Sequence, residues 1–185
     1  MTSDKINVTL PKSIATIASH LSAAAKAPTE ITDSLLAFRR DYPESKQTAF
    51  VIMSFEDTEP KRKIWTALRE ALSAINIKAL RADTKEYHSD LYYNVLTYIY
   101  GCTFGIAVFE RITSDLTNPN VIFEDGYTIA IGKQVCLLKD KTLAHLPTDI
   151  LGRLYIPFDP HNPSGTIPDK IKKWVKDQGF QKHHY

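Results

Sequence analysis

From residue 48 onward, continuous apolar runs alternate with segments of helical periodicity, and this alternation constrains the fold more than any other feature of the chain. The first run, AFVIM at residues 49–53, has no polar position, as is typical of strands with both faces buried in a parallel sheet. Further strands are expected at residues 77–80, 105–109, 134–139 and 153–158, the last at an edge because it contains Pro157. Helices are expected at residues 61–75, from a Ser89/Asp90 cap through residue 100, and at residues 121–131 and 167–178. Such strand–helix units predict an open, doubly wound α/β sheet.

The N-terminal part of the chain has a different character. Residues 11–26 are rich in Ala and Ser at helical spacing, Pro28 interrupts them, and residues 29–38 predict a second helix. We therefore expect a helical N-terminal arm at residues 1–46 and an α/β domain at residues 47–185. The arm has two interpretations, a dimerisation or partner-docking element and an extra layer packed on the sheet.

Charge and hydropathy exclude several classes of function. The net charge of +2 and the absence of a basic tract argue against a nucleic-acid partner. No stretch approaches the roughly 20 apolar residues of a membrane span, and no signal-like segment opens the chain, so we expect no membrane partner and a cytoplasmic protein. Cys102 and Cys136 adjoin apolar strands and are expected to be buried free thiols; without a Cys/His cluster, no metal site is expected.

The loops that follow parallel strands meet at one edge of the sheet, where such folds bind ligands. These loops are polar and mixed in charge, which suits a sugar or nucleotide, but they lack a glycine-rich phosphate-binding motif. Arg81 and Asp83 are predicted to bind a ribose or phosphate, with a surface ion pair or Asx-type cap as the alternative. Tyr92 and Tyr93 are suited to base stacking, although aromatic residues on an amphipathic helix belong more often to the core.

Glu124 is the candidate for chemistry at this edge. It follows the strand at residues 105–109 and is expected in the opening turn of a helix, where capping by residues 118–120 and the helix macrodipole would keep it ionised. A structural acid favoured by that same macrodipole is the alternative. A carboxylate in this place can attack the anomeric carbon of a nucleoside. Gly126 is expected to allow close approach of the helix to the sheet or ligand, with Tyr127 beside it and Gly132-Lys133 before the next strand.

FEDGYTIAIGK at residues 123–133 resembles the E-[LV]-G-Y-A-x-x-x-G-K segment of the nucleoside 2-deoxyribosyltransferase-like superfamily, in which the matching Glu is the nucleophile. NPNV at residues 118–121 and AFVIMSF at residues 49–55 resemble more specifically the TIR-like nucleotide-binding proteins of bacterial defence systems. The resemblance covers roughly residues 48–159. Asp125 departs from it, since an apolar residue usually follows the nucleophile, and a second acid there would raise the Glu124 pKa by like-charge repulsion. Asp83 and Asp90 are candidates for the second acidic residue of deoxyribosyltransferases.

The resemblance implies a flavodoxin-like, mostly parallel sheet and an enzyme that cleaves or transfers an N-glycosidic bond of a nucleotide or nucleoside. Glu124 would be the nucleophile. NAD⁺ is a candidate substrate, and no cofactor is expected. The alternative is a non-catalytic TIR-like module for nucleotide binding, signalling or self-assembly, with a homo-oligomer formed through the arm. The residues expected to contact the substrate are Ser54, Phe55, Arg81, Asp83, Asn118, Asn120 and Tyr127.

Overall fold

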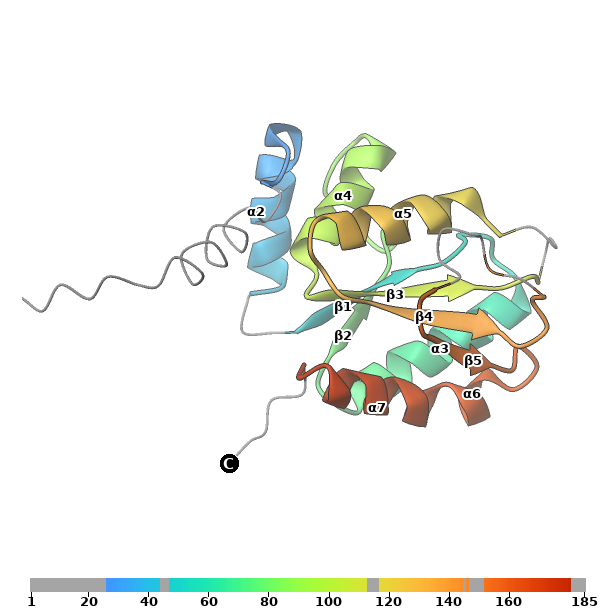
Figure 1. Ribbon diagram of the computed structural model, residues 1–185. Helices are drawn as coiled ribbons and strands as arrows, with labels where there is room; N and C mark the ends of the chain where they lie inside the picture. The colour runs from blue at the N-terminus through green and yellow to red at the C-terminus, as the bar shows by residue number, and fades with distance from the viewer. Residues whose placement is uncertain (1–25, 44–46, 113–116, 145, 147–151, 181–185) are drawn as a thin grey trace, which may run out of the picture.

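The computed structural model of the 185-residue chain describes residues 26–43, 47–112, 117–144, 146 and 152–180. Helices and strands alternate along these residues from residue 48 onward (Figure 1). The strands are β1 (Thr48–Ile52), β2 (Lys78–Leu80), β3 (Phe104–Phe109), β4 (Val135–Asp140) and β5 (Tyr155–Phe158). The helices are η1 (Thr29–Ile31), α2 (Thr32–Asp41), α3 (Glu59–Ser73), α4 (Leu91–Gly101), α5 (Pro119–Ala130), α6 (Pro163–Thr166) and α7 (Pro168–Asp177).

The five strands form one parallel sheet in the order β2-β1-β3-β4-β5. The chain therefore reverses its direction of winding between β1 and β3, as in flavodoxin-like sheets. This confirms the predicted fold class, and every strand pair is parallel. β5 lies at an edge, as Pro157 predicts, because proline has no backbone N–H to donate to a further strand.

Helices cover both faces of the sheet (Figure 1), with α2, α4 and α5 on one side and α3, α6 and α7 on the other. The apolar run of β1 contributes side chains to the hydrophobic core on each face of the sheet, since successive side chains of a strand point to opposite faces. Phe50 and Ile52 pack in the cluster that includes α4, whereas Ala49 and Val51 pack in the cluster that includes α3 and α7. The absence of polar positions in residues 49–53 follows from this two-sided burial.

The described part of the N-terminal arm packs against α4. Phe38 of α2 is fully buried, and its ring lies 5.5 Å from that of Tyr98. Ser34 and Thr97 share a buried hydrogen bond of 2.8 Å. Residues 29–41 thus form an additional layer, as one of the two interpretations expects. The helix predicted at residues 11–26 lies almost wholly outside the described residues, and the division at residue 46 stays a prediction.

Several element boundaries differ from those expected by one or two residues. α3 begins at Glu59 rather than residue 61, because Pro60 is tolerated in the first turn of a helix. The cap of α4 is as predicted: the helix begins at Leu91, and the Asp90 carboxylate accepts a hydrogen bond from Tyr93 N at 3.2 Å. Leu91 is 64% exposed at the start of the helix. The expected closing helix starts one residue late, at Pro168, after the short α6.

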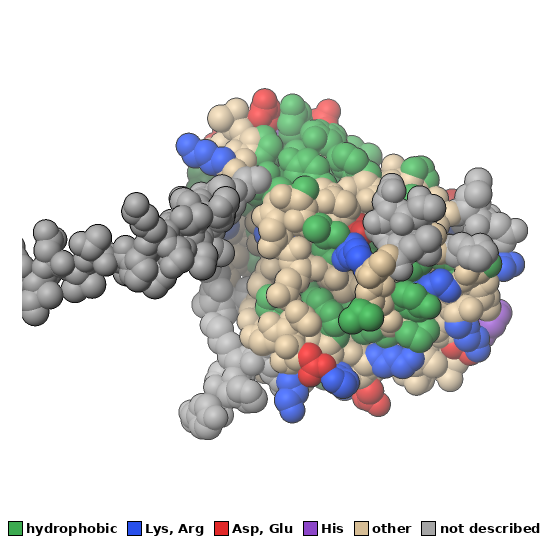
Figure 2. Space-filling view, viewed as in Figure 1, with side chains coloured by type: hydrophobic (Ala, Val, Ile, Leu, Met, Phe, Trp, Pro, Cys, Tyr) green, Lys and Arg blue, Asp and Glu red, His purple; other side chains and the backbone are tan. Residues whose placement is uncertain are grey.

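The surface carries scattered apolar side chains among charged ones. On the face seen in Figure 2, hydrophobic side chains show over α4 and around β4 and β5. Cys102 and Cys136 are buried free thiols, as predicted. Within the described ranges, no helix is long and apolar enough to cross a membrane.

Candidate active site

A cavity of about 380 Å³, termed here the Glu124 cavity, opens at the carboxyl edge of the sheet. Phe55 reaches it from the segment after β1, Asp90 is the cap of α4, and the other lining residues come from the first halves of α4 and α5. It therefore lies at the point where the winding direction reverses, the usual ligand crevice of an open α/β sheet. Its lining consists of Phe55, Asp90, Leu91, Tyr92, Val95, Asn120, Phe123 and Glu124.

Glu124 lies in the second turn of α5, and the expectation that it lies in the opening turn is wrong. The helix begins at Pro119, and the Asn118 side chain accepts a hydrogen bond from Asn120 N at 2.9 Å as its cap. The first turn contains no acidic residue. Because the macrodipole acts chiefly within the first turn, it has little hold on a carboxylate placed beyond that turn.

Burial instead dominates the electrostatics of Glu124. Its side chain is 8% exposed, and burial raises the pKa of the carboxyl group to about 7 from an ordinary 4.5. Among the described residues, neither a hydrogen-bond donor nor a cation contacts the carboxylate. The prediction that the helix N-terminus keeps Glu124 ionised is therefore wrong, and the group changes its charge near neutral pH.

Asp125 does not share the environment of Glu124. It is 1% exposed and forms a 2.7 Å ion pair with Arg153, whose Nη2 also donates to Val135 O. Neighbouring helix positions point about 100° apart, which separates the two carboxylates. Burial alone accounts for the raised pKa of Glu124, so the expected like-charge repulsion from Asp125 is not the cause.

Aromatic side chains from three segments flank Glu124. Tyr92 of α4 and Phe123 of α5 are each 48% exposed, with ring centroids 6.1 Å apart, and Phe55 is 39% exposed. Tyr92 therefore lies at the cavity and not in the core, whereas Tyr93 packs on His88. Helical spacing gives no signal for this position, because Tyr92 is in phase with the buried Val95 and Ile99. Phe123 was missed because the motif drew attention only to the residues that follow it.

The other residues expected from α5 have separate places. Asn120 lies one helical turn before Glu124 and lines the same cavity, whereas Asn118 serves as the helix cap. Tyr127 lies outside the lining and packs against Tyr100 of α4, with ring centroids 6.2 Å apart. Of these three, only Asn120 is brought together with Glu124.

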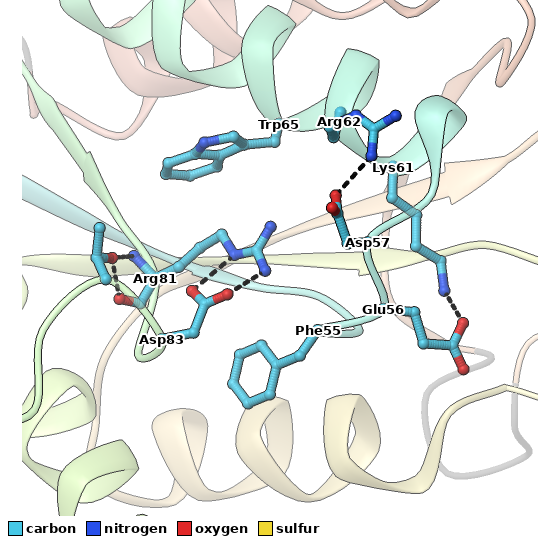
Figure 3. Close-up of a pocket in the computed structure, with 9 residues that line it drawn as sticks. Phe55, Glu56, Asp57, Lys61, Arg62, Trp65, Arg81 and Asp83 are labelled. Atoms are coloured by element: carbon cyan, nitrogen blue, oxygen red, sulfur yellow. Dashed lines mark hydrogen bonds and ion pairs between the residues drawn. The ribbon is translucent and has the colours of Figure 1, made fainter.

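A second cavity of about 290 Å³, termed here the Arg81 cavity, adjoins the first and shares Phe55 with it (Figure 3). Arg81 and Asp83 form a two-pronged ion pair there, with Nε–Oδ1 at 3.0 Å and Nη2–Oδ2 at 2.5 Å. The ion-pair alternative is thus present in the structure. Of the two candidates for a second acid, Asp90 lines the Glu124 cavity and Asp83 lines the Arg81 cavity.

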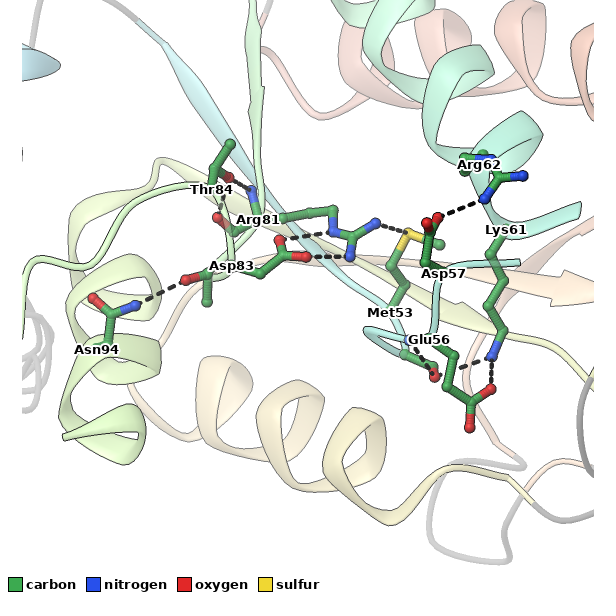
Figure 4. Close-up of polar contacts among 11 residues, drawn as sticks. Met53, Glu56, Asp57, Lys61, Arg62, Arg81, Asp83, Thr84 and Asn94 are labelled. Carbon is green, nitrogen blue, oxygen red and sulfur yellow. Dashed lines mark hydrogen bonds and ion pairs between the residues drawn. The ribbon is translucent and has the colours of Figure 1, made fainter. Parts of the chain in front are cut away.

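Ser54 takes part in a buried polar network behind these cavities. Its hydroxyl accepts a hydrogen bond from Lys61 Nζ at 3.0 Å. The same ammonium contacts Glu56 at 2.5 Å (Figure 4) and Glu110 at 3.2 Å. Lys61 thereby joins the segments that follow β1 and β3. Ser54 is itself buried and lines neither the Glu124 cavity nor the Arg81 cavity.

The glycines of the motif have roles away from the site. A Cβ at Gly126 would meet no atom within 4 Å, so the expected close approach of the helix to the sheet at this position is wrong, and close approach to a ligand stays a prediction. Gly132 has φ +83° and turns the chain before β4, and Lys133 Nζ donates to the carbonyls of Tyr100 and Cys102. Gly132-Lys133 thus closes the end of α4 at the opposite edge of the sheet. Burial lowers the pKa of Lys133 to about 8.

Metal chemistry finds no support in this part of the chain. Across the described ranges, no three His, Cys, Asp or Glu side chains are grouped to hold a metal ion. The cavity instead offers a carboxyl group that titrates near pH 7, flat aromatic surfaces and one amide, which together suit attack on a sugar that carries a planar base.

Comparison of the chain with models of known protein families gives a match. The model of the TIR domain of CAP12/Pycsar effector proteins matches residues 48–160. No curated protein sequence matches the chain.

Similar solved structures include a CMP N-glycosidase from Clostridium botulinum, with 18% identity, a TM-score of 0.49, and coverage of 69% of this chain and 99% of the other. A 2-deoxyribosyltransferase from Bacillus psychrosaccharolyticus has 13% identity, a TM-score of 0.45, and coverage of 63% and 90%. A 2-desoxiribosyltransferase from Leishmania mexicana has 17% identity, a TM-score of 0.43, and coverage of 52% of this chain and 66% of its own.

Proposed function

The chain belongs to the family of CAP12/Pycsar effector TIR domains, and on this premise we propose that it cleaves or transfers an N-glycosidic bond of a nucleotide or nucleoside. The observation that carries the proposal is Glu124, a buried carboxyl group with a pKa of about 7 in a cavity walled by aromatic side chains. Acids with shifted pKa values in a crevice are typical of catalytic groups. Family membership supports the proposal but does not specify the reaction.

In the proposed reaction, the ionised Glu124 attacks the anomeric carbon of the bound sugar. A glycosyl ester with the carboxylate forms as the bond from sugar to base breaks, and the bonding electrons leave with the base. Water then attacks the ester to give the free sugar product, or an acceptor base attacks it to give a new N-glycoside. Either attack releases the Glu124 carboxylate.

The charge of the cavity favours a cationic leaving group. Among the described lining residues are two carboxyl groups, Asp90 and Glu124, and no Lys, Arg or His. Aromatic faces attract cations as well, by roughly 0.5–2 kcal/mol for each well-placed ring. A pyridinium base leaves as a neutral molecule without a proton donor, whereas a neutral base needs one. We therefore rank NAD⁺ above deoxynucleosides as the substrate.

The test is base release from NAD⁺, NADP⁺, deoxynucleosides and deoxynucleotides, followed by chromatography at low and high protein concentration. We expect wild-type protein to release nicotinamide, and Glu124→Gln to lose at least about 100-fold in turnover while staying folded. Asp125→Asn is the matched control, because it alters the adjacent acid on the same helix. We expect it to lower stability through the Arg153 pair and to retain turnover per folded molecule.

Full activity in Glu124→Gln would contradict the assignment of the nucleophile. Binding of a nucleotide by wild-type protein without base release at any concentration would favour the second candidate, a nucleotide-binding or self-assembly module. The 64% exposure of Leu91 at the cavity mouth is the observation that favours this candidate, since exposed apolar groups often mark contact sites.

A further inference from the structure

The guanidinium group of Arg81 lies between two aromatic side chains, and its charge and both of its faces are already engaged. Its central carbon is 5.5 Å from the ring centroid of Trp65 and 5.8 Å from that of Phe55 (Figure 3). Nε and Nη2 are held by Asp83, and Nη1 points at Met53 Sδ at 3.9 Å. The Arg81 side chain is only 13% exposed. A ligand phosphate would have to compete with Asp83 for this group.

The segment that carries Arg81 and Asp83 is fixed from α4. Asn94, 2% exposed, donates a hydrogen bond to Ala82 O at 2.8 Å and accepts one from Tyr87 N at 2.8 Å (Figure 4). Thr84 adds a hydrogen bond from its hydroxyl to Arg81 O. A fully satisfied buried amide of this kind rigidifies the backbone around it. Arg81 is therefore held in place without any ligand.

Phe55 is more exposed than Arg81. It lies in the segment between β1 and α3 that has no regular secondary structure, and it is 39% exposed. Its ring nevertheless forms part of the wall of the Glu124 cavity and part of the wall of the Arg81 cavity. The guanidinium group of Arg81 lies over this ring, so it is well placed to fix the position of the Phe55 side chain in the cavity wall.

We propose that Arg81 is a positioning residue of the Glu124 cavity, which holds the Phe55 ring as a wall against the substrate and does not itself bind the substrate. This inference rests on the proposed function. It replaces the sequence-based expectation that Arg81 contacts a ribose or phosphate. The two roles differ in one measurable respect: a residue that acts through Phe55 matters equally for substrates with and without a phosphate.

The experiment compares nicotinamide riboside with nicotinamide mononucleotide, which share the same glycosidic bond and differ by one phosphate. We expect Arg81→Ala to lower kcat/KM by roughly 10-fold for both probes, chiefly through KM, because small displacements of positioning groups have effects of this size or larger. Phe55→Ala should cause a similar loss. Adding Arg81→Ala to Phe55→Ala should then cost little more, since the ring that Arg81 holds is gone. Arg81→Lys should not restore activity, because an ammonium lacks the planar, two-pronged geometry.

Arg62→Ala is the matched control. Arg62 lines the same Arg81 cavity, but its ion pair with Asp57 is exposed, so this variant removes an equal charge without touching Phe55. We expect it to leave kcat/KM for both probes unchanged. Arg81→Gln serves as a second variant if Arg81→Ala lowers the melting temperature.

A loss confined to the mononucleotide would show that Arg81 binds the phosphate and would overturn the inference. Losses that multiply in the double variant would do the same, because they would mean that Arg81 and Phe55 act independently. Wild-type protein that releases no base from these probes, NAD⁺, NADP⁺, deoxynucleosides or deoxynucleotides would defeat the proposed function itself, and this inference with it. Base release from deoxynucleosides alone would leave the proposed function standing, and the same comparison would then use a deoxynucleoside and its 5′-monophosphate.

Discussion

The Glu124 carboxyl group gives up most of its contact with water, and no cation among the described residues compensates for that loss. Its pKa of about 7 follows from burial alone, so the proton is held weakly at neutral pH and the group can serve as a nucleophile after losing it. The sequence identified the residue through its motif but placed it one turn too early. This error of one turn changes the expected pKa of Glu124. In the first turn the macrodipole would lower the carboxyl pKa, whereas in the second turn burial dominates and raises it.

Glu124 should make the stability of the protein depend on pH. Between about pH 4.5 and about pH 7, the folded state keeps a proton that the unfolded state has lost, so the free energy of unfolding falls as pH rises through this window. We expect Glu124→Gln to be more stable than wild type by roughly 2–3 kcal/mol at about pH 8, because the amide has no charge to bury. Denaturant titrations of both proteins across this range measure the difference. A gap that persists unchanged below about pH 4.5 would rule out ionisation as its source.

At the scale of helices and strands, α4 and α5 carry the site because their first halves face the same crevice. The apolar runs and capping residues predicted both helices, and the Asn118 cap and the edge position of β5 are confirmed. Local patterns did not show that Tyr92 and Phe123 meet, because a ring-to-ring distance between two helices depends on how the helices pack. The same reason explains why Gly126, prominent in the motif, proved to lie in open space.

Two helix glycines should respond in opposite ways to substitution by alanine. A Cβ at Gly101 would lie 2.5 Å from the Phe38 ring, whereas one at Gly126 would meet nothing within 4 Å. We expect Gly101→Ala to destabilise the fold by about 1–3 kcal/mol through overpacking of α2 on α4. Gly126→Ala should stabilise it by roughly 0.5–1 kcal/mol, because alanine favours the helix. Thermal unfolding of the two variants provides the test, and a stable Gly101→Ala protein would mean that α2 does not pack as described.

At the scale of the whole molecule, alternation of strands and helices is enough to predict a parallel sheet with a ligand crevice at its carboxyl edge. The strand order follows from the reversal between β1 and β3, which no single segment encodes. The residues expected to contact the substrate are instead distributed among the Glu124 cavity, the Arg81 cavity, a helix cap and a buried network. Their distribution also depends on how the elements pack, which no single segment encodes. Loops that meet at one edge still differ in the direction of each side chain.

The N-terminal arm supplies a further prediction at this scale. Ile31 and Phe38 are fully buried, so a chain that begins at residue 26 keeps every described contact of α2. We expect this shorter chain to fold with an unchanged melting temperature. Comparing the sedimentation of the two chains tests whether residues 1–25 contribute to the homo-oligomer predicted through the arm. Identical sedimentation of the two chains would exclude residues 1–25 from assembly and leave residues 26–46 as the part of the arm that remains to be tested.

The pH dependence of nicotinamide release from NAD⁺ tests the central claim most directly. With Glu124 as nucleophile, kcat/KM should rise with pH to a plateau, with an apparent pKa near 7, and this activity should be absent from Glu124→Gln. A rate that falls with pH through the same window would mean that the protonated carboxyl group is the active form, and would contradict the nucleophilic role. A flat profile that survives in Glu124→Gln would remove Glu124 from the chemistry altogether.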